Sequence, residues 1–505
     1  MLVKVHSAAL IGLTVHAIEV EIDSSYGISD WQIVGLPDTS VKESKERVRT
    51  ALKNSGFDFP PRVIVINMAP ASLKKEGPSF DLPIAIAILA ATEQIPADGL
   101  DNLLFIGELG LDGTLRPVRG MLPLSIESAD KNLSIVTGEQ NAVEASVGGT
   151  PTYGFSALSE VVDFLHRRDE VSPTKAPNLV QILAMEPRLD HDFSEIHGQK
   201  QAKRALEIAA AGGHNVIMTG SPGSGKTMLA RSLPSILPPL TEEECLECSK
   251  IYSIAGLLTS EQPLIIERPF RSPHHTSSVA SIIGGGSMPT PGEVSLSHNG
   301  VLFMDEFPEY SKGTLEALRQ PLEDGKVTVS RVSAQLTFPC NFILIAAMNP
   351  CPCGYLNDPH HQCTCTEAAI SRYRHKISGP LMDRFDIQLE VFPVEFNDLY
   401  DNTIIEESSC IVRERVMQAR AIQSKRFRND SIYCNANMSQ RQIQKYCSID
   451  ESGKRLMERA FNKLGISARA NNRILKLART IADLDGSDNI RPYHIAEAIS
   501  YREHQ

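Results

Sequence analysis

Eight consecutive residues between positions 220 and 227 have the types and spacing of a phosphate-binding loop. They read Gly-Ser-Pro-Gly-Ser-Gly-Lys-Thr and match the pattern G-x-x-x-x-G-K-[ST]. Glycines let a backbone approach a polyphosphate closely, so that several amide N–H groups can point at its oxygens. Lys226 is expected to bridge the β- and γ-phosphates, and the hydroxyl of Thr227 to bind Mg²⁺. The predicted nucleotide-binding residues of the loop are Gly220, Ser221, Pro222, Gly223, Ser224, Gly225, Lys226 and Thr227.

Two further apolar runs end in polar residues that could complete this site. The run 301–304 is followed by Asp305, which would hold the Mg²⁺ shell, and by Glu306, which would orient or deprotonate the attacking water. The run 342–348 ends at Asn349, whose amide could hold that water against the γ-phosphate. The alternatives are a strand followed by solvated acids, and an asparagine that only forms a turn. Together these residues predict hydrolysis of a nucleoside triphosphate with Mg²⁺.

Four cysteines within fifteen residues form the pattern C-x-C-x9-C-x-C, and they are Cys351, Cys353, Cys363 and Cys365. Four thiolates can close a tetrahedral shell, and Zn²⁺ is the ordinary occupant of such a site. We therefore expect a structural zinc ion. Because the spacing is tighter than in the usual C-x2-C pair, His360 or His361 could replace one sulfur ligand. Two disulfides are the competing interpretation, which a reducing compartment disfavours.

Length, charge and hydropathy limit the number of domains, the kind of partner and the location of this protein. A chain of 505 residues is expected to hold two to four domains. Its net charge of −11 argues against a broad basic surface, so any contact with nucleic acid must be local or built by several copies. The longest apolar runs, 82–91 and 342–348, are far shorter than the roughly 20 residues that cross a membrane. The alternation at 18–23 is typical of a strand rather than a signal peptide, and the cysteine pattern favours a cytoplasmic location.

The chain divides most plainly at a polar stretch, 172–178, which contains two prolines. A mixed α/β region precedes it, and the nucleotide-binding region follows. Helical periodicity dominates beyond residue 393. The predicted domains are an N-terminal domain (1–170), a linker (171–192), a nucleotide-binding core (193–393) and a helical domain (394–505).

These motifs resemble the AAA+ ATPases, and within them the magnesium-chelatase-like branch and the YifB/ComM family. The segments that carry the resemblance are Pro269–Thr276, Met348–Gly354 and Ile377–Asp386, and the likeness extends over essentially the whole chain. It implies an α/β fold with a Lon-protease-like α+β domain, an AAA+ P-loop core and a small C-terminal helical lid. It also implies a homo-oligomeric ring, expected to be a hexamer, and it agrees with zinc at the cysteine cluster.

The resemblance assigns two arginines to the catalytic site. Arg384 resembles the arginine finger that reaches the γ-phosphate of a neighbouring subunit, although Arg372 and Arg374 are rivals. Arg469 resembles the second sensor on the helical lid, where it would contact the γ-phosphate, and Arg473 is the alternative. The expected catalytic residues are thus Lys226, Glu306, Asn349, Arg384 and Arg469.

Residues 76–82 resemble the nucleophile-bearing segment of Lon-type proteases, with Ser79 at the position of the nucleophile. A Ser–Lys dyad needs a lysine as base, and this chain has Leu122 where the pattern places it. We therefore expect that the fold is kept, that the peptidase chemistry is lost and that Ser79 caps a helix.

Residues 326–338 alternate in two arms around a polar turn, which predicts a β-hairpin. In the family such a hairpin projects into the pore of the ring, and so does an insertion that we place at 281–295. Lys326 and Arg331 are expected to contact DNA phosphates, although a solvated hairpin with incidental charges is equally compatible. The resemblance implies a DNA motor for branch migration of recombination intermediates in natural transformation. An ATP-dependent protease or unfoldase, and a chelatase-type motor subunit, are the alternatives.

Overall fold

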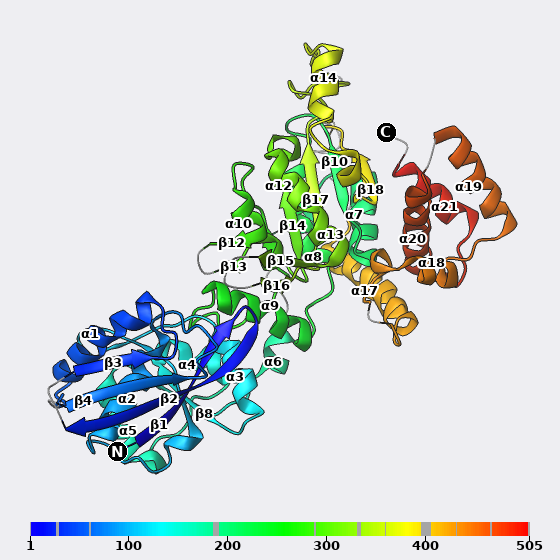
Figure 1. Cartoon of the computed structure of the whole chain (residues 1–505). Coiled ribbons are helices and arrows are strands. Elements are labelled where there is room, and N and C mark those ends of the chain that lie inside the picture. Colours follow the sequence, from blue (N-terminus) through cyan, green and yellow to red (C-terminus); the bar gives the residue numbers. More distant parts are fainter. Residues whose placement is uncertain are drawn as a thin grey trace. The chain divides into compact units, whose positions relative to one another are not determined.

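Figure 1 shows a computed structural model of the chain, which forms two compact units. One unit contains residues 1–185 and 241–266, and the other contains residues 186–240 and 267–505. The structure describes residues 2–502 apart from 27–29, 60–61, 185–190, 287–288, 331–334, 359, 395–405, 431 and 465–466.

The N-terminal unit is built on a seven-stranded mixed sheet with the order β3-β4-β2-β1-β5-β8-β9. β1 (Leu2–Ile11) and β2 (Thr14–Tyr26) form an antiparallel pair, and Ile18, Val20 and Ile22 point into the core as their alternation predicts. Helix α2 (Asp81–Ala91) packs on these two strands and is buried along its whole length. The other strands are β3 (Asp30–Val34), β4 (Arg62–Ala69), β5 (Leu103–Phe105), β8 (Ser134–Gly138) and β9 (Thr152–Phe155), with a separate pair β6 (Glu108–Leu109) and β7 (Leu115–Arg116).

The helices of this unit include one that comes from a distant part of the chain. Helix α9 (Glu242–Ala255) packs against α3 (Met121–Ala129), and the N–H of Gly120 donates to the carbonyl of Ser253 at 3.1 Å. The predicted nucleotide-binding core, 193–393, includes α9, although this helix belongs to the N-terminal unit. The remaining helices are α1 (Thr39–Asn54), α4 (Glu139–Ser146), α5 (Leu158–His166) and α6 (Leu179–Leu183), and the short 3-10 turns are η1 (Pro78–Phe80), η2 (Leu100–Asn102) and η3 (Arg168–Glu170).

The second unit contains a five-stranded parallel sheet with the order β11-β14-β17-β10-β18. Alternate strand residues, such as Val216, Phe303 and Ile345, enter one continuous apolar core with residues of the flanking helices. The strands are β10 (Val216–Thr219), β11 (Phe270–Arg271), β14 (Val301–Met304), β17 (Ile343–Met348) and β18 (Ile387–Glu390). The helices of this part are α7 (Lys200–Gly212), α8 (Lys226–Ile236), α12 (Lys312–Ala317), α13 (Arg319–Asp324), α14 (Glu367–Arg374) and α15 (Gly379–Met382), with turns η4 (Phe193–Glu195) and η5 (Phe307–Glu309).

Two small hairpins extend from this core. The first pairs β15 (Lys326–Ser330) with β16 (Gln335–Pro339) in antiparallel register, which confirms the predicted β-hairpin. The second lies in the predicted insertion and pairs β12 (Gly284–Gly285) with β13 (Thr290–Pro291) between α10 (Val279–Ile283) and α11 (Glu293–Leu296).

The C-terminal part is helical, as predicted. Helix α17 (Ser409–Arg426) packs on α7 and α8, and α20 (Ala468–Leu484) packs on α7 and α21 (Pro492–Ser500). The other elements are η6 (Asn435–Asn437), α18 (Gln440–Tyr446) and α19 (Glu451–Leu464). Among the described residues, no helix combines the length and apolar character needed to cross a membrane. The predicted α/β class, with a parallel-sheet core followed by C-terminal helices, is confirmed.

Candidate nucleotide and metal sites

The predicted phosphate loop, acidic pair and amide lie at one edge of the parallel sheet. The loop follows β10, Asp305 follows β14 and Asn349 follows β17, and these three strands are neighbours. The N–H of Gly220 donates to the carbonyl of Met348 at 3.2 Å, so the first residue of the loop is tied to the strand that ends at Asn349. The carboxyl ends of parallel strands are where α/β sheets bind ligands.

Lys226 is buried inside the loop and is held by the loop's own carbonyl groups. Its Nζ donates to the carbonyl of Gly220 at 2.7 Å and to that of Ser221 at 2.9 Å, and it lies 3.5 Å from Oδ1 of Asn349. Burial lowers the pKa of Lys226, and the Asp305 carboxylate partly opposes this shift. An ammonium group held by neutral oxygens of carbonyl and hydroxyl groups can exchange these partners for phosphate oxygens, which are stronger acceptors.

The two residues that we assign to Mg²⁺ are in contact. The Thr227 hydroxyl donates to Oδ2 of Asp305 at 3.1 Å. A hydroxyl and a carboxylate are oxygen donors that suit Mg²⁺, which keeps several waters and takes its remaining ligands from phosphates. These residues fit the ion that ATP chemistry requires. Thr227 and Asp305 would hold Mg²⁺, and the charge of the ion would offset that of the phosphates.

Glu306 is oriented by its backbone and by a histidine. Its φ of 49° lies in the left-handed region that side chains rarely adopt, and its N–H donates to Oδ1 of Asp305 at 2.8 Å. Nδ1 of His275 lies 2.9 Å from Oε2 of Glu306. His275 lies in the segment 269–276, for which the sequence indicated a family resemblance but no contact with Glu306. Its role was missed because no local pattern shows that the loop after β11 reaches the end of β14.

Arg384 and Arg469 lie at the opposite edge of the sheet. Both line one cavity together with Asn215, the residue before β10, whose Nδ2 donates to the carbonyl of Arg384 at 3.1 Å. The phosphate loop follows the other end of the same strand. The cavity also receives Arg473, whose guanidinium lies 3.6 Å from Asp386. Within one chain, these arginines are therefore separated from Lys226 by the length of β10.

The rival arginines are placed differently. Arg372 and Arg374 are exposed on α14, and Arg374 lines a small cavity with Gly220 and Ser221 of the same chain's phosphate loop. Arg384 is largely buried, is paired with Glu323, and its Nη1 lies 3.5 Å from the carbonyl of Pro380. Arg374 thus lies beside its own phosphate loop, whereas Arg384 lies at the edge of the sheet away from it.

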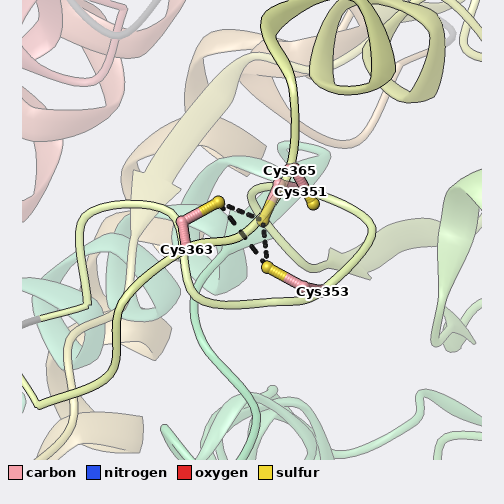
Figure 2. Close-up of side chains that lie close together, drawn as sticks. All are labelled: Cys351, Cys353, Cys363 and Cys365. Atoms are coloured by element: carbon pink, nitrogen blue, oxygen red, sulfur yellow. Dashed lines mark hydrogen bonds between the residues drawn. The ribbon is translucent and has the colours of Figure 1, made fainter.

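The four cysteines of the predicted zinc site converge (Figure 2). Their ligand atoms all lie within 4.8 Å of one another, and the sulfur of Cys351 is 3.4 Å from that of Cys353 and 3.7 Å from that of Cys363. A tetrahedron with Zn–S bonds of about 2.3 Å has sulfur atoms roughly 3.8 Å apart, whereas a disulfide needs about 2.05 Å. The donor set and the spacing therefore fit a zinc ion better than two disulfides.

Neither histidine of this loop belongs to the cluster. Nδ1 of His361 lies 3.2 Å from Oδ1 of Asp358, and its ring stacks on Tyr355. Among the residues described, the group able to hold a metal ion consists of the four cysteines. Hydrogen bonds from backbone amides, first that of Tyr355, lower the pKa of Cys353 to about 6, so that this thiol is already a thiolate at neutral pH.

The Lon-like segment differs from our expectation in one detail. Ser79 lies within the turn η1, and helix α2 begins after Phe80 with no side-chain cap, so Ser79 does not cap it. One free N–H at the start of α2 is satisfied by a backbone group instead, because the N–H of Leu82 donates to the carbonyl of Gly107 at 3.0 Å. Leu122 is buried in α3, at the position where the protease pattern has lysine.

The predicted DNA contacts are described only in part. Lys326 is exposed at the start of β15, opposite Pro339. Arg331 lies outside the described residues. The buried face of the hairpin consists of Val327, Val329, Leu336 and Phe338, so the exposed face is left for Lys326 and for the pair Thr328 and Thr337.

Comparisons with known proteins agree with this architecture. Residues 192–399 match the family described as "Magnesium chelatase, subunit ChlI", residues 20–141 match "Subunit ChlI of Mg-chelatase", and residues 406–502 match "Magnesium chelatase, subunit ChlI C-terminal".

Full-length relatives are similar as well. The chain is 43% identical over 500 residues to the uncharacterized protein YifB of Escherichia coli, covering 99% of this chain and 96% of the relative. It is 41% identical over 501 residues to the competence protein ComM of Haemophilus influenzae, covering 99% and 97%. It is 28% identical over 246 residues to the magnesium-chelatase 67 kDa subunit of Heliobacterium mobile, covering 42% and 35%.

Proposed function

The chain belongs to the YifB/ComM family of magnesium-chelatase-like AAA+ proteins, and from this we propose that it is an ATP-driven ring-shaped motor that moves DNA. Its load is a branched recombination intermediate, and its setting is natural transformation in the cytoplasm. Zinc at the four cysteines has a structural role. One relative is named a competence protein, which is consistent with this setting.

The observation that carries the motor proposal is the separation of Arg384 from its own phosphate loop. The loop follows β10, while Arg384 contacts the residue that precedes it. A guanidinium that stabilises transition-state charge must touch the γ-phosphate, so Arg384 has to serve the nucleotide of a neighbouring subunit. The exposed Arg469 lines the same cavity and would act on the same neighbour. Assembly, expected as a hexamer, then becomes a condition of hydrolysis.

DNA is proposed as the load because the hairpin β15–β16 carries a positive side chain, which every subunit of a ring would contribute once. One exposed Lys326 contributes little by itself, but six copies in a pore would line a strand of phosphates. Arg331, which lies between β15 and β16 in the sequence, is proposed to add a second ring of charge. This arrangement reconciles DNA binding with a net charge of −11.

The alternative proposals receive less support. A protease would need a base beside Ser79, and the expected position is held by the buried side chain of Leu122. A chelatase-type subunit agrees with the family matches, but the similarity to the magnesium-chelatase 67 kDa subunit covers 42% of this chain, whereas that to the competence protein ComM covers 99%.

The experiment that tests the proposal is an ATPase assay with competing loads. We expect single-stranded or branched DNA to raise ATP turnover, and a Lys326→Gln variant to lose much of this stimulation while it keeps the unstimulated rate. Stimulation by an unfolded protein and not by DNA would support an unfoldase instead.

A further inference from the structure

The loop that carries the four cysteines also contacts the phosphate loop. Between the cysteine pairs lies Asp358, whose side chain is only 4% exposed. Its Oδ1 accepts from the N–H of His360 and from the N–H of His361, both at 2.9 Å, and its carboxylate also interacts with the hydroxyl of Ser221. The same carboxylate therefore connects the cysteine loop to the second residue of the phosphate loop.

A second contact lies four residues before Asp358. Gly354 has a φ of +88°, and a Cβ atom added to it would lie 2.8 Å from Cδ and from Cγ of Pro222. Real Cβ atoms do not approach this closely, so the glycine allows the cysteine loop to pack directly on the third residue of the phosphate loop. Cys351 is buried only two positions beyond Asn349, which lies 3.5 Å from Lys226.

These contacts reach the phosphate loop through residues 221 and 222. A phosphate loop binds by presenting several backbone N–H groups in one fixed arrangement, so its affinity depends on how well that arrangement is held before the nucleotide arrives. Among the residues described between Asn349 and α14, the cysteine loop has no regular secondary structure, and it therefore depends on cross-links for its shape. Four sulfur ligands to one ion would provide them.

We propose that the four-cysteine loop is a metal-dependent clamp on the phosphate loop, and that Asp358 is the positioning residue that transmits metal occupancy to nucleotide affinity. This inference rests on the proposed ATP site, but it does not depend on DNA being the load. Because coupling between two ligands is reciprocal, bound nucleotide must also tighten the hold on the metal.

The test measures binding rather than turnover. The full-length chain carrying Glu306→Gln would be titrated with a fluorescent ATP analogue, with its zinc content measured by elemental analysis. We expect one zinc ion per chain and a loss of nucleotide affinity after removal of zinc by a chelator. In this background Asp358→Asn should keep its zinc and weaken nucleotide binding by roughly two- to tenfold, as for loss of one hydrogen bond.

Two further variants separate a specific link from general damage. Ser221→Ala removes the other partner, so the double variant with Asp358→Asn should bind no more weakly than the weaker single variant. His360→Ala is the matched control, because it removes an exposed side chain from the same loop and keeps the backbone N–H that Asp358 accepts.

The reciprocal measurement uses a chromogenic chelator as competitor for zinc. ATP should reduce the equilibrium transfer of zinc from the parent chain to the chelator, and this protection should disappear in Asp358→Asn. Unchanged nucleotide affinity in Asp358→Asn, or equal zinc transfer with and without ATP, would overturn the clamp while leaving the ATP site intact. Failure of the parent chain itself to bind the ATP analogue would instead overturn the proposed function.

Discussion

Nδ1 of His275 lies 2.9 Å from Oε2 of Glu306, and this pair joins the loop after β11 to the carboxylate that we propose as the catalytic base. The neighbouring His274 makes a different contact, with its Nδ1 2.9 Å from the hydroxyl of Thr276. A carboxylate whose Oε2 is engaged with a histidine is held in one orientation and has one oxygen fewer for water, so we expect release of His275 to be a step in activation.

Replacement of His275 tests this restraint. We expect His275→Ala to raise the unstimulated rate of ATP hydrolysis by roughly two- to tenfold, since it removes one hydrogen bond that holds Glu306. The ratio of the DNA-stimulated rate to the unstimulated rate should fall correspondingly. The matched control is His274→Ala, which should leave both rates near those of the parent. Equal loss of activity with and without DNA in His275→Ala would show that the histidine supports catalysis instead of restraining it.

Glu306→Gln separates nucleotide binding from hydrolysis. The amide cannot accept a proton from water, so turnover should fall by about 100-fold or more. Binding should persist, because Lys226 and the Thr227–Asp305 pair are untouched. Phosphate release and titration with an ATP analogue measure the two properties. Hydrolysis at the parent rate would refute the assignment of Glu306.

Arg384→Ala tests whether the active site is shared between subunits. The variant should bind ATP, because Arg384 lies at the far edge of the sheet from its own loop, and it should lose hydrolysis by on the order of 1,000-fold. Mixing it with Lys226→Ala should restore part of the activity, since some sites would then combine an intact phosphate loop with an intact arginine.

The control for this experiment is Arg372→Ala on the exposed face of α14, which we expect to hydrolyse ATP normally. If the mixture were no more active than its two components, while each still assembled into rings, the shared site would be rejected.

Glu144 makes the stability of the N-terminal unit depend on pH. Burial raises the pKa of this carboxyl, which accepts from the N–H of Leu122 at 3.1 Å and from the hydroxyl of Ser253 on α9. A raised pKa means that the fold favours the protonated form. Its contribution to stability is therefore fully present below the ordinary pKa of about 4.5 and is lost as the pH rises through the folded-state value.

Thermal unfolding measured from pH 5 to pH 8 checks this dependence. Glu144→Gln keeps an acceptor for both hydrogen bonds and never ionises, so its melting temperature should fall less with rising pH than that of the parent. Glu127→Gln, at an exposed position of α3, should follow the parent. Parallel curves for the parent and Glu144→Gln would contradict the assignment.

The arrangement of the candidate nucleotide site was largely predictable because each of its parts is a short local segment of the sequence. Lys226, Asp305 and Asn349 each lie shortly after an apolar strand. Such a short pattern can be read without knowing how the strands are paired in the sheet. The hairpin β15–β16 and the cysteine cluster could also be predicted, because each is formed by residues close together in the sequence. His275 and Asp358 were not found, since each acts through a contact with a residue far away in the chain. The same holds for α9, whose partner Glu144 lies 109 residues before Ser253.

The most direct test of the central claim is branch migration of a synthetic four-way DNA junction by the purified full-length chain. With ATP and Mg²⁺ we expect the junction to be converted into two duplex products, whereas Glu306→Gln should bind the junction and leave it unresolved. Active ATP hydrolysis with no conversion of the junction, and with no change of rate when DNA is added, would contradict the claim that this chain is a DNA motor.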